Sequence, residues 1–287
     1  MAPLSFDLTL PRVRSTSLVF SSPHSGRDYQ QGFLRSSVLD QRTIRSSEDA
    51  FVDDLLDCVP DLGAPLLAAR APRAYVDLNR GPDELDPAVI EGLRPAGYNP
   101  RVSSGLGVIP RVVAGGKAIY RGKLSPAEVM HRIDGCWTPY HDCLKGLIEE
   151  SRSLFGEAIL IDMHSMPHEA VDSIAAAGAR RPEIVIGDRF GASAGRDVVD
   201  RIEEAFQRRG LRTLRNAPFA GAYIAQTYGR PNAATHVVQI EIDRSLYMNE
   251  REVRPNGNYK GFKAALAAIL AEVVLIGRDE KRQLAAE

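Results

Sequence analysis

The stretch AILIDMHSM, residues 158–166, decides the fold of this chain and gives the first indication of a functional site. Residues 158–163 are apolar apart from one aspartate, which predicts a β-strand. Because successive side chains of a strand point to opposite faces, Asp162 and His164 share one face, and Ile161 and Met163 take the other. Open α/β sheets bind ligands outside the carboxyl ends of their strands, so the polar end of this stretch marks a candidate site.

The rest of the chain alternates between short apolar runs and longer helical patterns. We expect strands over residues 17–20, 65–69, 74–78, 158–163, 184–187, 211–215 and 236–242, and helices over 48–58, 125–155, 194–209 and 259–275. This alternation predicts an α/β fold in which helices cover both faces of a mostly parallel sheet. The second helix begins at Ser125, an N-cap residue that is followed by Pro126 and by an acid in the first turn, Glu128.

Length and charge limit the classes of partner. The 287 residues suffice for one large α/β domain, and because no linker or repeat divides them we expect a single domain over residues 1–287. Lys and Arg total 36 against 37 Asp and Glu, a formal net charge of -1, and no basic stripe is interleaved with aromatic residues. This balance argues against nucleic acid and an anionic membrane surface as partners and favours a small molecule.

The sequence also predicts a cytoplasmic protein without a membrane span. Its N-terminus lacks the apolar segment of a signal peptide, and its most apolar run, residues 264–277, contains Glu272 and is shorter than the ~20 residues of a span. Cys58, Cys136 and Cys143 form no CxxC pair, which argues against a disulfide framework and a thiolate zinc site. Residues 81–122, rich in glycine and proline, have little periodicity, and we expect them to line or cover a site.

Polar residues end other strands as well. LVFSSPHSG, residues 18–26, leads into a turn that holds His24, and HVVQIEID, residues 236–243, places Glu241 on one face between Ile240 and Ile242 on the other. Two histidines and a carboxylate are the protein ligands of many catalytic zinc ions, with the fourth position left for water, and they also suit manganese, iron or cobalt. The acid nearest to His24 in a suitable context is Glu48 or Asp49.

Each of these residues also has an ordinary structural interpretation. A lone histidine near a strand end is often a hydrogen-bonded structural residue, and Glu48 or Asp49 could favour the start of a helix capped by Ser47. Glu241 is harder to explain in this way, because a carboxylate in a central strand needs a partner or a function. The remaining histidines show no HxxH or HExxH spacing and are assigned structural roles: His131, His141, His168 and His236.

Several short blocks of this chain, taken in order, resemble one known family. The sequence resembles the N-formylglutamate amidohydrolase (deformylase) family in PHSG (23–26), SEDAFVDDL (47–55), PRAYVDLNRGPDE (72–84), TPYH (138–141), IDMHSMP (161–167), GDRFGAS (187–193), YGRP (228–231) and QIEIDRSLYM (239–248). Each block is short, but the ordered set covers most of the chain. One departure is Ala194, where relatives often have a cysteine, and it leaves the proposed metal ligands unaffected.

The resemblance implies a fold and a metal site. The fold is a three-layer α/β sandwich around a mixed, mostly parallel sheet, similar to that of the zinc carboxypeptidases and aspartoacylases. The metal, Zn²⁺ or another divalent ion, is bound by His24, His164 and Asp49, with Glu48 as the alternative carboxylate.

The resemblance also implies roles for the remaining site residues. Glu241 corresponds to the general base, and Arg73 supplies positive charge either to an oxyanion or to a second carboxylate. Asn79 and Arg80 hold a substrate carboxylate, because a planar guanidinium can bind a carboxylate through two parallel hydrogen bonds. Arg230 is a further candidate for substrate binding.

The activity implied by the resemblance is the metal-dependent hydrolysis of N-formyl-L-glutamate to formate and L-glutamate, a step of histidine degradation. Two alternatives stay open. The first is a metal-dependent amidohydrolase or carboxypeptidase-like hydrolase that acts on another N-acyl amino acid. The second is a non-catalytic binding protein on the same fold.

Overall fold

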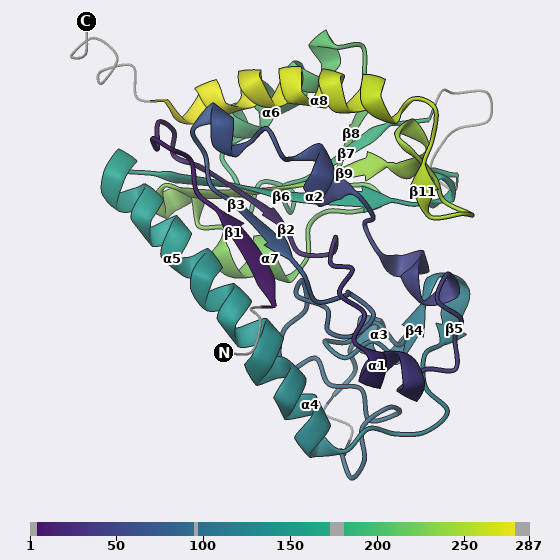
Figure 1. Cartoon of the computed structure of the whole chain (residues 1–287). Coiled ribbons are helices and arrows are strands. Elements are labelled where there is room, and N and C mark those ends of the chain that lie inside the picture. Colours follow the sequence, from purple (N-terminus) through teal and green to yellow (C-terminus); the bar gives the residue numbers. More distant parts are fainter. Residues whose placement is uncertain (1–4, 95–96, 173–180, 279–287) are drawn as a thin grey trace, which may run out of the picture.

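A seven-stranded sheet lies at the centre of the part of the chain that this computed structural model describes, residues 5–94, 97–172 and 181–278 (Figure 1). Its strands run in the order β1-β3-β2-β6-β9-β7-β8. They are β1 (Phe6–Thr9), β2 (Leu18–Ser22), β3 (Leu66–Ala69), β6 (Ala158–Met166), β7 (Ile184–Gly187), β8 (Thr213–Arg215) and β9 (Thr235–Asp243).

The sheet is mixed and mostly parallel, as expected from the sequence. β3, β2, β6 and β9 are parallel neighbours, whereas β1 pairs antiparallel to β3 and β7 pairs antiparallel to β9. β6 and β9 are the longest partners, in register from Ala158 opposite Thr235 to Met166 opposite Asp243. The carboxyl ends of the four parallel strands therefore meet at one edge of the sheet.

Helices cover both faces, which confirms the layered α/β architecture. One face packs against α2 (Val52–Leu55), α6 (Arg196–Arg208) and α8 (Tyr259–Val273), and the other packs against α4 (Pro126–Arg132), α5 (Thr138–Phe155) and α7 (Tyr223–Tyr228). Figure 1 shows α6 and α8 on one side of the sheet and α5 on the other. Each interface is an apolar core, because strand side chains alternate between the two faces.

The strand β6 shows how this alternation positions a site. Ile159, Ile161 and Met163 lie in the core beneath α6 and α8, whereas Ala158 and Leu160 lie in the core on the α5 side. Asp162 and His164 continue the α5-side row toward the carboxyl end of the strand. The predicted change from apolar to polar residues therefore takes place on one face of the sheet.

The helix expected over residues 125–155 is present, with one irregularity. Ser125 is its N-cap, and the serine Oγ accepts a hydrogen bond of 3.2 Å from the backbone N–H of Glu128. A π-helical segment, Ile133–Trp137, joins α4 to α5. The helices expected over 194–209 and 259–275 correspond to α6 and α8.

The strand expected over residues 74–78 is wrong. The backbone N–H groups of Tyr75 and Val76 both bond to the carbonyl of Pro72, so this segment forms turns. Apolar residues at every second position, 74, 76 and 78, give the sequence a strand-like pattern, but Ala74 packs in one core and Val76 and Leu78 pack in another.

The helix expected over residues 48–58 is present only as α2 (Val52–Leu55). Phe51 adopts a left-handed conformation (φ 68°), and neither Glu48 nor Asp49 caps the helix. Instead, the backbone N–H of Asp49 donates a 3.0 Å hydrogen bond to the carbonyl of His24. This bond ties the acidic segment to the loop after β2. The strand β1 was not expected from the sequence.

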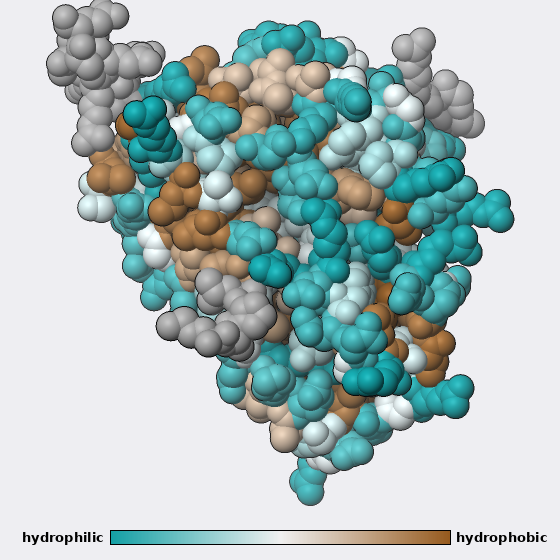
Figure 2. Space-filling model, in the orientation of Figure 1, coloured by the Kyte–Doolittle hydropathy of each residue, from teal (hydrophilic) through white to brown (hydrophobic). Residues whose placement is uncertain are grey.

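Residues 81–122 contain short elements on one side of the molecule: α3 (Pro100–Ser103), β4 (Val112–Val113) and β5 (Lys117–Ala118). The remaining short elements are α1 (Gln31–Ser36) and the hairpin of β10 (Met248–Asn249) with β11 (Arg254–Pro255). Hydrophilic residues predominate on the face seen in Figure 2. Among the described residues, no helix combines the length and the apolar character that crossing a membrane requires.

Candidate active site

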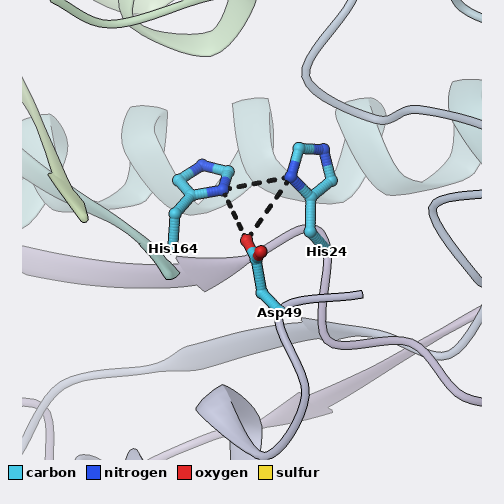
Figure 3. A group of neighbouring side chains, drawn as sticks. All are labelled: His24, Asp49 and His164. Carbon is cyan, nitrogen blue, oxygen red and sulfur yellow. Dashed lines mark hydrogen bonds and ion pairs between the residues drawn. The ribbon is translucent and has the colours of Figure 1, made fainter. Parts of the chain in front are cut away.

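Three side chains from separate parts of the sequence converge at the carboxyl edge of the sheet (Figure 3). His24 follows β2, His164 lies in β6, and Asp49 lies in the segment before α2. His164 Nδ1 lies 3.1 Å from His24 Nδ1 and 3.0 Å from Asp49 Oδ2, and His24 Nδ1 lies 3.6 Å from the same oxygen. All three side chains are buried.

These three atoms fit the donor set of a divalent metal. Four ligands at the 2.0–2.1 Å bond lengths of zinc are separated by about 3.3 Å in a tetrahedron, which is close to the three separations above. Two imidazole nitrogens and one carboxylate oxygen are also the mixture found at catalytic zinc sites that keep a position open. The spacing of these three atoms is therefore compatible with a tetrahedral metal site.

Each of the three side chains is held from behind by a second residue. His24 Nε2 lies 2.7 Å from Asp77 Oδ1, and His164 Nε2 lies 3.0 Å from Asp162 Oδ2. A neutral imidazole that donates from Nε2 to a carboxylate leaves the lone pair of Nδ1 for the centre of the site. Partners of this kind fix the ring orientation of metal-binding histidines.

The carboxylate Asp49 is held by Arg244. The guanidinium donates from Nη2 to Asp49 Oδ1 at 2.9 Å, which leaves Oδ2 facing the histidines. Arg244 also donates to the carbonyl of Ser46 and to Ser165 Oγ, so it is buried with hydrogen-bond partners for each of its nitrogens.

The electrostatics of the site favour a positive charge at its centre. Burial by itself would raise the pKa of Asp49, but hydrogen bonds to His164 and His24 and the charge of Arg244 hold that pKa well below its ordinary value. Burial would likewise lower the pKa of His164, but Asp162 and Asp49 raise it well above its ordinary value. The surrounding carboxylates therefore stabilise a cation, and a divalent metal satisfies the same preference.

Glu48, the alternative carboxylate ligand, lies elsewhere. Its two oxygens accept hydrogen bonds of 2.9 Å each from Arg45, and Tyr29 donates to it at 3.1 Å. Of the two neighbouring acids, only Asp49 is grouped with the histidines.

Glu241 lies beside the three converging residues on β9. In the register of β6 and β9 it is directly opposite His164, and Gln239 Nε2 donates to its Oε1 at 2.8 Å. Burial raises the pKa of Glu241 to about 7, although the charges of His164 and Arg73 oppose this rise. A carboxyl group with a pKa near neutrality is suited to accept and return a proton.

Comparison with known proteins gives a consistent result. Residues 16–248 match the family model described as N-formylglutamate amidohydrolase. The chain belongs to this family. It is 29% identical to N-formylglutamate deformylase of Pseudomonas aeruginosa and 28% identical to that of Pseudomonas putida, in each case over 82% of this chain and 83% of the relative. The crystal structure of N-formylglutamate amidohydrolase from Ralstonia eutropha matches with a TM-score of 0.88 and 34% identity, over 96% of this chain and 100% of that one.

In this N-formylglutamate amidohydrolase family member, His24, His164 and Glu241 line a pocket of about 570 Å³. Arg73 and Arg80 line it, together with part of the segment 81–122 that was expected to line a site. The Nε of Arg73 donates to Asp77 Oδ2 at 3.1 Å, which leaves the two terminal nitrogens of Arg73 without a partner among the described residues.

Asn79 also lines the pocket, but its amide is engaged within the protein. Nδ2 lies 3.2 Å from Asp162 Oδ2 and 3.4 Å from Gln239 Oε1, and Oδ1 accepts a 2.8 Å hydrogen bond from the backbone N–H of Ile224. Asn79 therefore connects the supports of His164 and Glu241.

Arg230, the remaining predicted substrate-binding residue, does not line this pocket. Its side chain is exposed, and Nη1 donates to the backbone carbonyls of Gln226 and Gly229. His141 and His168 lie outside the three converging residues as well. His141 bonds to Leu78 and Tyr228, and His168 pairs with Asp243 at 2.7 Å.

Sequence reasoning assigned no supporting role to the residues that hold the three converging side chains. Asp77 and Asp162 occur in the quoted motifs DLNR and IDMHS, so their position in those motifs was an available signal. Arg244 follows QIEID directly, but nothing in its local sequence indicates that it bonds to an acid 195 residues away. Arg101 lines the pocket from the segment 81–122, which had no pattern from which to place it.

Proposed function

We propose that this protein hydrolyses the formamide bond of N-formyl-L-glutamate to formate and L-glutamate. The observation that carries the proposal is the convergence of His24, Asp49 and His164 beside Glu241, in a pocket lined by arginines, in a member of the N-formylglutamate amidohydrolase family. The names of the relatives support the substrate. The three free cysteines fit the reducing cytoplasm that we propose as the location.

A divalent metal, Zn²⁺ in the first instance, would be bound by His24, Asp49 and His164. Such a metal would supply Lewis acidity that lowers the pKa of water, so that hydroxide is available to attack the amide at neutral pH. The chain contributes the orientation of this site, because Asp77, Asp162 and Arg244 hold the three ligands in place.

Glu241 is the proposed general base. It would take a proton from the attacking water and return it to the departing amine, so that glutamate leaves as a neutral amine. A pKa of about 7 suits both steps near neutral pH. Gln239 binds only Oε1, which leaves Oε2 of Glu241 for the proton.

Arg73 is the proposed donor to the oxyanion that develops on the formyl oxygen. Its Nε is held by Asp77, and its terminal nitrogens are free to donate into the pocket. A donor that is already oriented stabilises developing charge without reorganisation during the reaction.

Arg80 is the proposed ligand of a substrate carboxylate, in the DLNR segment that the family resemblance assigns to this role. Asn79 would support it, since the carbonyl of Asn79 accepts a 2.9 Å hydrogen bond from Arg80 Nη1. Arg230 has less support as a substrate ligand because of its position outside the pocket.

Metal removal tests the proposal. We expect about one divalent metal per chain in the purified protein, release of formate from N-formyl-L-glutamate, loss of that activity with chelator and recovery on adding Zn²⁺. If the protein hydrolyses other N-acyl amino acids in a chelator-sensitive reaction but releases no formate, the proposed substrate is wrong and the metal-dependent reaction stands. Full formate release from metal-free protein would overturn the metal site.

A further inference from the structure

Arg101 is a cationic residue of the pocket that has no assigned role. It lies in α3 (Pro100–Ser103) and lines the pocket together with Arg80. Among the residues that the structure describes, the guanidinium of Arg101 has no hydrogen bond or ion pair. An exposed arginine at a pocket wall with all its side-chain donors free is suited to bind an anion.

Arg80 also keeps donor capacity for the pocket. Its Nε donates to the carbonyl of Leu106 at 3.0 Å and its Nη1 to the carbonyl of Asn79 at 2.9 Å, while Nη2 has no partner within the described ranges. The side chain is buried, with only 7% of the residue exposed. Two nitrogens of the Arg80 guanidinium are therefore held by backbone carbonyls, and Nη2 is left to donate to a ligand in the pocket.

The two arginines belong to one framework, which is centred on Glu84. Its Oε1 accepts a 2.8 Å hydrogen bond from the backbone N–H of Gly81, next to Arg80. Its Oε2 accepts from Asn99 Nδ2 at 3.2 Å, and Asn99 Oδ1 in turn caps α3 by accepting from the N–H of Arg101 at 2.9 Å. This chain of bonds fixes the start of α3 relative to the turn after Arg80.

The framework places like charges near each other. Burial lowers the pKa of Arg80, and the charges of Arg73 and Arg101 lower it further, although the charges of Asp77 and Glu84 raise it. Bringing cations together is unfavourable unless an anion lies between or beside them. Asp77 and Glu84 supply part of this negative charge, and the free donors of Arg80 Nη2 and of Arg101 leave this wall of the pocket able to bind a ligand with more than one negative charge.

We propose that Arg80 and Arg101 bind the two carboxylates of a dicarboxylic substrate, with Arg101 as the residue that selects for the side-chain carboxylate. Arg80 is buried and lines the same pocket as His164 and Asn79, so we assign to it the α-carboxylate, which lies next to the amide. Arg101 reaches the more distant carboxylate from the exposed side of the wall. This inference deepens the proposed function and rests on it for the identity of the reaction.

The test compares two substrates of equal length. N-formyl-L-glutamate and N-formyl-L-glutamine differ only in the side-chain carboxylate, which is an amide in the second. We expect Arg101→Ala to lower kcat/KM for the glutamate compound by roughly 10- to 100-fold, mainly through KM, and to leave the glutamine compound unchanged. The control is Arg121→Ala, an exposed arginine of the same segment that does not line the pocket, and it should change neither value.

A binding measurement separates this inference from the reaction. By calorimetry, the unsubstituted protein should bind glutarate more tightly than its monoamide, and Arg101→Ala should lose that preference. Retained preference in Arg101→Ala, or an equal loss for both ligands, would overturn the role of Arg101 even if formate release is confirmed. Lost preference in a protein that releases no formate would support the dicarboxylate site and overturn the proposed reaction.

Discussion

At the scale of single residues, the site depends on pairs rather than on isolated ligands. His24 is paired with Asp77, His164 with Asp162, and Asp49 with Arg244. A buried carboxylate or imidazole without such a partner would be costly, and its orientation would be free to vary. The pairs therefore explain why three polar side chains can face one another in the interior.

Glu241→Gln tests the proposed general base. Glutamine keeps the size of the side chain and can still accept the hydrogen bond from Gln239, so the fold and the bound metal should be retained. Because the amide cannot take a proton, kcat for formate release should fall by about 10²-fold or more. Kinetics and metal analysis of the same preparation check both expectations, and an unchanged kcat would remove Glu241 from the reaction.

At the scale of elements, the long strands could be predicted because their apolar runs are continuous. β6 and β9 were expected, and so was the face that holds His164 and Glu241. The segment 74–78 could not be predicted correctly, since a buried loop with an apolar side chain at every second position has the same sequence pattern as a strand. In the segment before α2, the bond from the N–H of Asp49 to the carbonyl of His24 outweighs the local preference for a helix.

The helix α4, which follows the N-cap Ser125, contacts segments that lead into the pocket. Arg132, on α4, is buried with its guanidinium 4.1 Å from the ring centroid of Tyr75, and it donates to the backbone carbonyl of Tyr75 and to Tyr120 Oη. Tyr75 directly precedes the stretch that carries Asp77 and Arg80. The last residue of α4 therefore supports a site segment that has no regular secondary structure of its own.

Ser125→Ala should weaken this support. Loss of the 3.2 Å bond to the N–H of Glu128 leaves a first-turn donor without its cap, and the free energy of unfolding should fall by about 1 kcal/mol. Urea unfolding measures the change. Ser153→Ala, an exposed serine in α5, is the matched control and should be neutral or slightly stabilising because alanine favours helix. Equal stability of the Ser125 variant and the unsubstituted protein would contradict the capping role.

At the scale of the whole molecule, the fold collects residues whose relation is invisible along the sequence. The polar ends of β2, β6 and β9 could be expected at one edge, because parallel strands place their carboxyl ends together. Arg244 and Arg101 could not be placed in advance, since their partners and neighbours are set by long-range packing of segments without periodic patterns. The sequence thus predicts the chemistry of the centre better than the chemistry of the pocket wall.

The buried residue His141 is also held by long-range packing, and it makes the stability of the protein depend on pH. The residue is buried on α5, where Nε2 lies 2.8 Å from the carbonyl of Leu78 and Nδ1 lies 2.9 Å from Tyr228 Oη. The carbonyl requires a donor, so Nε2 carries the proton and Nδ1 accepts from the tyrosine, which is the neutral form of the ring. Burial lowers the pKa of His141 from 6.5 to about 4, although the bond to Leu78 raises it in part.

This shift predicts that His141 destabilises the folded chain as the pH falls. Above pH 6.5 the imidazole of His141 is neutral in both the folded and the unfolded chain. Between pH 6.5 and about 4 the unfolded chain binds a proton at His141 and the folded chain does not, so the free energy of unfolding falls as the pH falls. Below about pH 4 both states bind the proton, and the loss of stability is complete. The contribution across this range is about 3 kcal/mol. The variant His141→Gln can still donate a hydrogen bond to the carbonyl of Leu78 but cannot bind the proton. Between pH 7 and pH 4, its free energy of unfolding, measured with urea, should therefore fall by about 3 kcal/mol less than that of the unsubstituted protein. Other titrating carboxylates act in both proteins and cancel in the comparison, so parallel stability curves would show that His141 is not the neutral buried group inferred here.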